Sequence, residues 1–287
     1  MLFHLLLERL SRQELAREPE PQLVMNDPVQ VAAFDASGSE EGVLAFTHLY
    51  HAVHMTPLIR PGERVLDLAC GPANQLAQVA LLNPAAHFVG LDASANMLQR
   101  ARDTLARNGV HNVELVRADM THLQDFDDAS MDGVICTMSL HHLPDQAALW
   151  ATLREARRVL KPGGGLYFVD FGRLKRASTQ RFFAFDRRDC QSAQFTRDYL
   201  QSLKAAFSLQ ELSEAAALLG AGVRRHVTPL APFMVVFKSA ACRPMDAATE
   251  RLVRQQHDRL TPSQQRDFRV FERWFRGAGY TLPCTLP

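Results

Sequence analysis

The sequence predicts an α/β protein with a doubly wound, mostly parallel sheet of seven strands. Five short apolar runs rich in β-branched residues alternate with segments of helical periodicity. These runs are RVLDLA (64–69), HFVGLD (87–92), VELVRA (113–118), DGVICT (132–137) and GLYFVDF (165–171). Strands that alternate with helices form a parallel sheet covered on both faces, because each crossover lays a helix on one face.

Two further apolar runs lie close together at the end of this region. GVRRHVT (222–228) and PFMVVFK (232–238) are separated by a few residues around Pro229. A parallel crossover needs about a dozen residues or more, so these two runs can pair only in antiparallel fashion. We therefore expect an antiparallel strand at the C-terminal end of the sheet.

Helical segments are predicted on both sides of this core. We divide the chain into an N-terminal helical cap (1–60), a core (61–240) and a C-terminal helical extension (241–287). The first residues, MLFHLLLERL, have apolar side chains at helical spacing, and Glu8 and Arg9 interrupt them. That pattern favours an amphipathic helix over a signal sequence.

The tail predicts two helices. One runs from Asp246 to Leu260, and the other begins at Thr261, a capping residue followed by proline. The second helix carries an aromatic stripe at helical spacing, formed by Phe268, Phe271, Trp274 and Phe275. We expect the stripe to pack onto the core or onto a second subunit, which leaves a homodimer through the helical extensions as an open alternative.

Composition excludes several classes of protein. Lys and Arg number 32 against 31 for Asp and Glu, so the formal net charge of +1 provides no global attraction to nucleic acid or anionic membranes. The five cysteines show no CxxC spacing, which indicates neither a disulfide framework nor a zinc site. No apolar stretch reaches the length of a membrane span. We expect a cytoplasmic protein with no nucleic-acid partner.

A chemically informative turn follows the first strand. The strand ends at Asp67, small residues follow, and a helix begins near Asn74. Ligands of doubly wound sheets bind beyond the carboxyl ends of the strands, where a small-residue turn allows close approach and the helix start offers free N–H groups. Asp92 ends the next strand, where a carboxylate can accept both hydroxyls of a ribose. Asp119 and Met120 follow the third strand and offer an acid and an apolar face to adenine.

At these residues LDLACGPA resembles the first motif of class I S-adenosylmethionine-dependent methyltransferases, usually Asp-x-Gly-x-Gly-x-Gly. The segments FVGLDASANML, RADM, FDDASMDGVICTMSLHHL and LREARRVLKPGGGLYFVD follow in the order of the later motifs. The chain is thus similar, over about residues 60 to 240, to the family that includes the ubiquinone and menaquinone methyltransferases. The resemblance implies a Rossmann-like fold and S-adenosylmethionine as cofactor.

The resemblance also implies roles for individual residues in cofactor binding. Asp67 would help to hold the ammonium group of the cofactor, and Asp92 would bind its ribose. The remaining implied contacts are Ala69 and Gly71 around the methionine part, Asn74 at the start of the helix that follows, Ala93 and Met97 at adenosine, Asp119 and Met120 at adenine, and Thr137 and Met138 at the sulfonium.

Two alanines depart from the motif. Ala69 and Ala73 replace its first and last glycines, and alanine costs little only where φ stays negative. We expect the small-for-small exchange to preserve cofactor binding; the alternative is a fold that has lost its affinity. A dinucleotide site is disfavoured, because two of three expected glycines are missing and Asp67 would repel a pyrophosphate.

Two adjacent histidines follow the fourth strand, where the methyl group would be presented. Displacement at a sulfonium needs mainly alignment, and a base only if the acceptor must lose a proton. We rank His142 ahead of His141 as a catalytic base or substrate anchor; the alternative is a pair that caps the next helix. No further ligand at a suggestive spacing accompanies the pair, so no metal site is predicted.

Two other segments are candidates for substrate contact. In FTHLYHAVHMT, before the first strand, we select Tyr50 and His51. In the basic and aromatic stretch from Arg173 to Arg188, within a predicted substrate lid at 172–208, we select Arg181. The predicted function is methyl transfer to an O, N or C atom of a small molecule. The alternatives are an RNA or protein methyltransferase and a non-catalytic cofactor-binding module.

Overall fold

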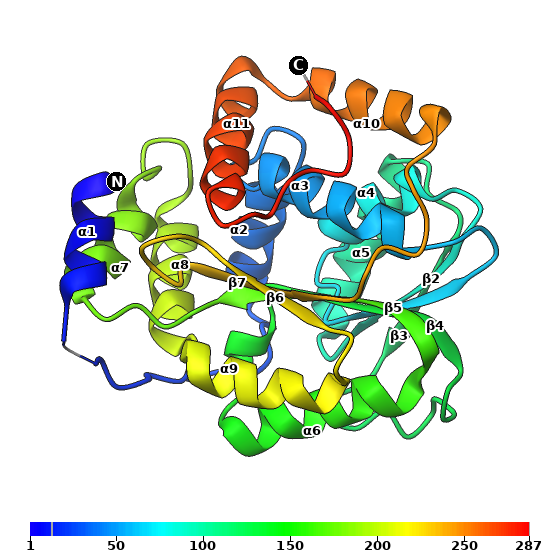
Figure 1. Cartoon of the computed structure of the whole chain (residues 1–287), viewed down its shortest axis with the longest axis horizontal. Helices are drawn as coiled ribbons and strands as arrows, with labels where there is room; N and C mark the ends of the chain where they lie inside the picture. The colour runs from blue at the N-terminus through cyan, green and yellow to red at the C-terminus, as the bar shows by residue number, and fades with distance from the viewer. Residues whose placement is uncertain (13, 287) are drawn as a thin grey trace.

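A single mixed sheet organises the computed structural model, which describes residues 1–12 and 14–286 (Figure 1). Its strands are β1 (Arg64–Leu68), β2 (His87–Asp92), β3 (Val113–Arg117), β4 (Met131–Thr137), β5 (Leu160–Phe171), β6 (Arg224–Val227) and β7 (Met234–Lys238). They lie in the order β3-β2-β1-β4-β5-β7-β6.

The pairing confirms the predicted topology. β1 pairs in parallel with β2 and β4, β2 with β3, and β4 with β5. β7 is antiparallel to both of its neighbours, β5 and β6. The order reverses between β1 and β4, and this is the position at which doubly wound sheets bind their ligands.

Helices cover both faces of the sheet and bury a core on each (Figure 1). One face carries α3 (Ala45–Met55), α4 (Asn74–Leu82) and α5 (Ala95–Arg107), with α10 (Ala247–Arg259) and α11 (Pro262–Arg276) outside them. The opposite face carries α6 (Gln146–Val159) and α9 (Leu209–Ala216). Short 3₁₀ turns lie at Thr56–Leu58, Leu140–His142 and Ala217–Leu219.

The predicted terminal helices are present. α1 (Leu2–Leu10) packs against α7 (Ala177–Phe185), which packs against α8 (Ala193–Ala205); α7 and α8 are the two helices of the predicted lid, and α2 (Pro28–Gly38) contacts α8 (Figure 1). α11 begins after Thr261, whose side chain accepts from Gln264 N in a capping box. The aromatic stripe of α11 packs inside the same chain, where Phe275 stacks on Tyr50 of α3. Within the described ranges no helix combines the length and apolarity needed to cross a bilayer.

Candidate active site

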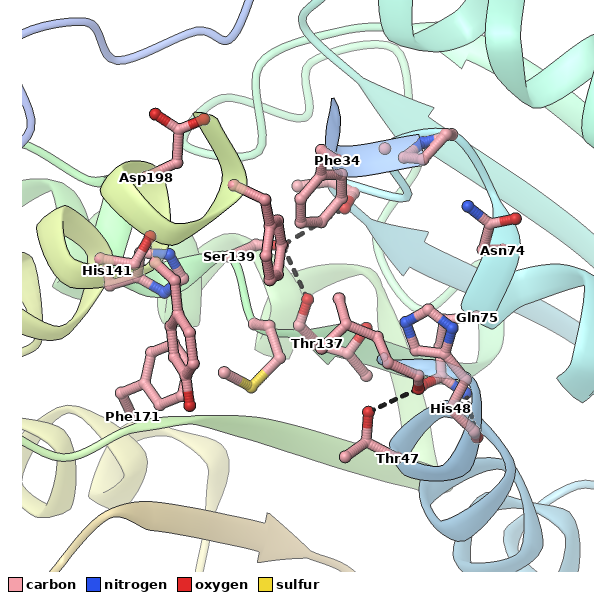
Figure 2. Close-up of a pocket in the computed structure, with 18 of the residues that line it drawn as sticks. Phe34, Thr47, His48, Asn74, Gln75, Thr137, Ser139, His141, Phe171 and Asp198 are labelled. Atoms are coloured by element: carbon pink, nitrogen blue, oxygen red, sulfur yellow. Dashed lines mark hydrogen bonds between the residues drawn. The ribbon is translucent and has the colours of Figure 1, made fainter. Parts of the chain in front are cut away.

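A cavity of about 730 Å³ lies at the carboxyl ends of β1, β2 and β4 (Figure 2). Its volume falls within the range of about 300–1,000 Å³ that is typical of small-molecule sites. Most of the residues predicted to bind the cofactor line this cavity: Ala69, Gly71, Asn74, Asp92, Ala93, Met97, Asp119, Met120, Thr137 and Met138. Asp67 is not among the lining residues.

The turn after β1 is tied to the end of β2 by Asp92. Its Oδ2 accepts from the Gly71 backbone N–H at 2.9 Å, and its Oδ1 accepts from Ser94 N at 2.8 Å. Each carboxylate oxygen has a second lone pair, so two ribose hydroxyls can still be accepted. Burial raises the pKa of Asp92, while these two backbone donors oppose the rise.

The backbone of this turn is left-handed at three positions. φ is 58° at Ala69, 55° at Gly71 and 60° at Ala73. The sequence allowed the two alanines at little cost only if φ were negative, and the structure places both in the region that favours glycine. Met138, at the end of β4, also has a positive φ of 52°. Strained backbone of this kind gathers at ligand sites.

Asp67 lies two residues before the turn and is 1% exposed. Its Oδ1 has no hydrogen-bond partner among the described residues. Burial, together with the nearby carboxylate of Asp92, raises the pKa of Asp67 well above its usual value. Asp67 thus lies behind the left-handed turn rather than on the cavity surface, and a carboxyl group at this position suits a cationic group, such as the ammonium of S-adenosylmethionine, better than it suits a pyrophosphate. The residues present therefore fit this cofactor.

The residues at the end of β4 face the turn that follows β1. Ser139 Oγ donates to Thr137 O at 2.8 Å and approaches Ala69 O at 3.3 Å. Figure 2 shows Thr137 and Ser139 between His141 on one side of the cavity and His48 on the other. The end of β4 therefore lies between the residues predicted to bind the cofactor and the rest of the cavity.

Both histidines after β4 line the cavity, and each is held by a carboxylate. His141 Nδ1 lies 2.7 Å from Asp170 Oδ1, and its backbone N–H donates to Asp170 Oδ2 at 3.1 Å. Burial opposes protonation of His141, but Asp170 outweighs it and the pKa of His141 is raised. His142 Nδ1 lies 2.7 Å from Glu20 Oε2. The two imidazole rings are 4.3 Å apart between centroids.

Glu20, which the sequence did not reveal, does not line the cavity itself but contacts His142, which does. It belongs to a segment between α1 and α2, residues 17–27, which we call the N-terminal strap. The run Glu18-Pro19-Glu20-Pro21 reads in the sequence as a polar break, and its prolines, which favour an extended backbone, are the one local signal of an ordered segment. Three later residues of the strap, Leu23, Val24 and Met25, line the cavity directly.

The predicted substrate residues have different fates. His51 lines the cavity; its Nδ1 lies 2.7 Å from Tyr167 Oη, and its buried Nε2 has no partner in the described part of the chain. Burial lowers the pKa of His51 to about 3, which keeps the ring neutral. Tyr50 does not reach the cavity, because it faces the aromatic stripe of α11.

Arg181 also lies outside the cavity. It is exposed, and its guanidinium lies over the ring of Phe185. Phe183, two residues later on α7, lines the cavity instead. Two residues turn a helix by about 200°, so a helix that directs Phe183 inward directs Arg181 to solvent.

Aromatic side chains line the part of the cavity beyond Thr137 and Met138. They come from β5, the lid helices, the loop before β7 and α11. The set comprises Phe171, Phe183, Phe195, Tyr199, Phe233, Phe271 and Trp274, whereas Phe34 of α2 lies against Gly71 in the turn after β1. This end of the cavity is thus suited to an apolar molecule.

Comparisons with known proteins agree with this geometry. Residues 65–164 match the model of a methyltransferase domain. Over 113 residues the chain is 39% identical to a demethylmenaquinone methyltransferase of Listeria monocytogenes serotype 4a (strain HCC23), a match that covers 39% of this chain and 46% of that protein. It is 38% identical over 118 residues to the 27-O-demethylrifamycin SV methyltransferase of Amycolatopsis mediterranei (strain S699), covering 41% of each. The matched region thus spans less than half the length of these curated relatives.

Solved structures share the fold. A SAM-dependent methyltransferase from Aquifex aeolicus superposes with a TM-score of 0.54 at 18% identity, covering 75% of this chain and 98% of that one. A putative O-methyltransferase from Nostoc punctiforme gives a TM-score of 0.55 at 20% identity, covering 79% and 64%. The matched residues and the strand order lead to one conclusion: residues 65–164 of this chain carry a methyltransferase domain, and the sheet around them has the fold of S-adenosylmethionine-dependent methyltransferases.

Proposed function

We propose that this protein transfers the methyl group of S-adenosylmethionine to a small, largely apolar acceptor by in-line displacement. One observation supports this proposal most strongly: the residues predicted to bind the cofactor, at the strand ends, and the aromatic side chains beyond Met138 line the same cavity. The cofactor supplies an activated methyl group when bound. The contribution of the chain is to align the acceptor with that methyl group and to exclude water.

Two relatives support a small acceptor. Their names specify demethylmenaquinone and 27-O-demethylrifamycin SV as the molecules methylated, and both are small molecules. The aromatic lining extends the same inference to this chain, because aromatic walls stabilise apolar ligands that water would otherwise surround.

The basic residues of the lid are weak support for a nucleic-acid acceptor, because two of their arginines are already paired with carboxylates. Arg173 pairs with Glu211 at 2.9 Å, and Arg187 pairs with Asp267 of α11. A phosphate backbone would have to displace these carboxylates before it gained the charge of the arginines. The paired arginines hold the lid to its neighbours, which also fits an enclosed small-molecule site.

Methyl-tritiated cofactor tests the proposal. The purified protein is incubated with it and with 2-naphthol, 1,4-dihydroxynaphthalene, bulk tRNA or a mixture of unfolded proteins. We expect tritium in the organic extract of a naphthol reaction and none in acid-precipitated RNA or protein. Label in the precipitate alone would contradict a small acceptor, and so would the absence of transfer to every small probe. Asp92→Ala, which removes the ribose-binding carboxylate, is the negative control.

A further inference from the structure

The N-terminal strap is anchored on both sides of the cavity. The Arg17 guanidinium donates to the backbone carbonyls of His141 at 2.9 Å and Pro144 at 2.6 Å, and it stacks on the ring of Phe207. Toward the cofactor residues, Asn26 Oδ1 accepts from the hydroxyl of Ser94 at 2.7 Å. A segment tied down at both ends holds the residues between its anchors in fixed positions.

Glu20 lies between these anchors and reaches His142. Its Oε2 is 2.7 Å from His142 Nδ1, and its Oε1 accepts from Ser202 Oγ of α8 at 2.9 Å. Burial alone would raise the pKa of Glu20, but the hydrogen bond and charge of His142 bring the pKa below its usual value. Glu20 is therefore ionised at neutral pH.

The ionised carboxylate selects one tautomer of His142. A carboxylate can only accept a hydrogen bond, so His142 Nδ1 must carry a proton. In the neutral ring the lone pair is then on Nε2, which makes no hydrogen bond to any described residue. The His142 side chain lines the cavity and is 25% exposed, whereas that of His141 is 4% exposed. His142 is thus the more accessible of the two rings.

We propose that Glu20 and His142 form a carboxylate–histidine pair that deprotonates a hydroxyl group of the acceptor. This inference rests on the proposed function and narrows it to acceptors with a phenolic or enolic hydroxyl. His142 Nε2 takes the hydroxyl proton while the acceptor oxygen bonds to the methyl carbon. The carbon–sulfur bond breaks, and its electron pair stays on sulfur as a neutral thioether. The products are a methyl ether and an imidazolium beside the Glu20 carboxylate, which stabilises the new charge.

Glu20 and His142, together with His141, are the one group among the described residues whose side chains are close enough together to bind a metal ion. One donor atom from each of Glu20, His141 and His142 lies within 4.8 Å of the others. Both oxygens of Glu20 already accept hydrogen bonds, one of them from His142 itself, so a cation would have to break that contact. These contacts favour a carboxylate–histidine pair over a metal site. The metal content of the purified protein is therefore measured as part of the test.

The first experiment needs no acceptor. Long-range proton–nitrogen NMR of histidine-labelled protein with S-adenosylhomocysteine reports which nitrogen of His142 carries the proton. We expect protonated Nδ1 and unprotonated Nε2 in the wild type and in the matched variant Glu18→Ala, which truncates an exposed glutamate of the same strap. In Glu20→Ala we expect a mixture of tautomers. Protonated Nε2 in the wild type, or no change in Glu20→Ala, would overturn the pair.

The second experiment compares two acceptors of one shape. At pH 8 2-naphthalenethiol is largely ionised and needs no base, whereas 2-naphthol does. We expect Glu20→Ala to lower kcat for 2-naphthol by about 10- to 100-fold, within the contribution of a positioned base, and to change kcat for the thiol by less than about 3-fold. Equal losses for both acceptors would make Glu20 a structural residue and overturn the proposal.

Two controls separate this inference from the proposed function. Calorimetry with S-adenosylhomocysteine should give the same affinity for wild type and Glu20→Ala, because Glu20 bonds His142 and Ser202 and is not among the residues that line the cavity. If the wild type methylates neither acceptor, the proposed function fails for them, and the NMR result still decides the pair. A stoichiometric divalent metal in purified wild type that Glu20→Ala loses would replace the pair with a metal site.

Discussion

The backbone N–H of Gly71 donates to the carboxylate of Asp92 at 2.9 Å, so the turn after β1 and the end of β2 form one unit. The acid that would bind ribose is also the acceptor that holds the turn. Binding of the cofactor and the shape of its cradle are therefore coupled through one side chain.

Asp92→Ala should lower the affinity for S-adenosylhomocysteine by about 100-fold or more, because hydrogen bonds to a charged group contribute about 1.5–3 kcal/mol each. Calorimetry measures the effect. Asp132→Ala is the matched control: Asp132 lies at the amino end of β4 and bonds Arg64 N and Lys161 Nζ. An equal loss in both variants would show a general effect of removing a carboxylate.

Asp67→Asn should stabilise the cofactor-free protein and weaken cofactor binding. The raised pKa of Asp67 means that its charge costs stability at every pH above the unfolded value, and the cost grows until pH passes the folded pKa. The gain, about 1–3 kcal/mol at most, should therefore be larger at pH 8 than at pH 5. Thermal unfolding at both pH values measures it, and a variant less stable than wild type at pH 8 would contradict this assignment.

Ala69→Gly should stabilise the protein by up to about 1 kcal/mol, because glycine removes a left-handed penalty of about 1–2 kcal/mol and adds a smaller entropic cost. Ala73→Gly is the matched test at nearly the same φ. Ala73 is fully buried, so loss of its methyl costs about 1 kcal/mol and should cancel the gain. Urea unfolding measures the free energy of unfolding of both variants. If Ala69→Gly is less stable than the wild type, the backbone at Ala69 is not strained.

Tyr50→Phe should leave methyl transfer unchanged and leave stability equal or higher. The Tyr50 hydroxyl is buried and has no hydrogen-bond partner in the described ranges, and removing an unsatisfied polar group is neutral or favourable. Tyr167→Phe is the comparison, because it removes a hydroxyl that contacts both His51 and Tyr280. We expect it to cost about 1 kcal/mol in thermal or urea unfolding. Loss of methyl transfer in Tyr50→Phe would contradict this prediction and show that the Tyr50 hydroxyl takes part in the reaction.

The His141–Asp170 pair should make stability depend on pH. The pKa of His141 is raised in the folded state, so the stabilisation of the charged pair is complete below the unfolded value of about 6.5 and is lost as pH rises through the folded pKa. The stability difference between wild type and Asp170→Asn should therefore be largest below that value and shrink at higher pH. A difference that grows with pH would contradict a charged pair.

The sequence predicted the sheet, and most of the residues it proposed for cofactor binding lie together in one cavity, because both patterns follow local rules. Apolar runs show strands by their residue types, and acids at the strand ends, such as Asp92, meet at one edge of any parallel sheet. The order of the motifs then indicated the turn after β1 as the one expected to face the cofactor.

The rest of the site depends on tertiary arrangement. Glu20 meets His142 across 122 positions, and no local pattern reports such a contact. The outward direction of Arg181 follows from the rotation of α7 on the core, and the positive φ of Ala69 from the path of the turn. The residue types alone do not determine how a helix is rotated on the core or which backbone path a turn follows.

Calorimetry of the purified wild type with S-adenosylhomocysteine, with NADH as the competing ligand, tests the central claim that the turn after Asp67 and the carboxylate of Asp92 form a cradle for this cofactor. We predict saturable one-to-one binding of S-adenosylhomocysteine that Asp92→Ala weakens by about 100-fold or more, and no heat with NADH. Well-folded protein that gives no heat with S-adenosylhomocysteine, or that binds NADH tightly, would contradict the account.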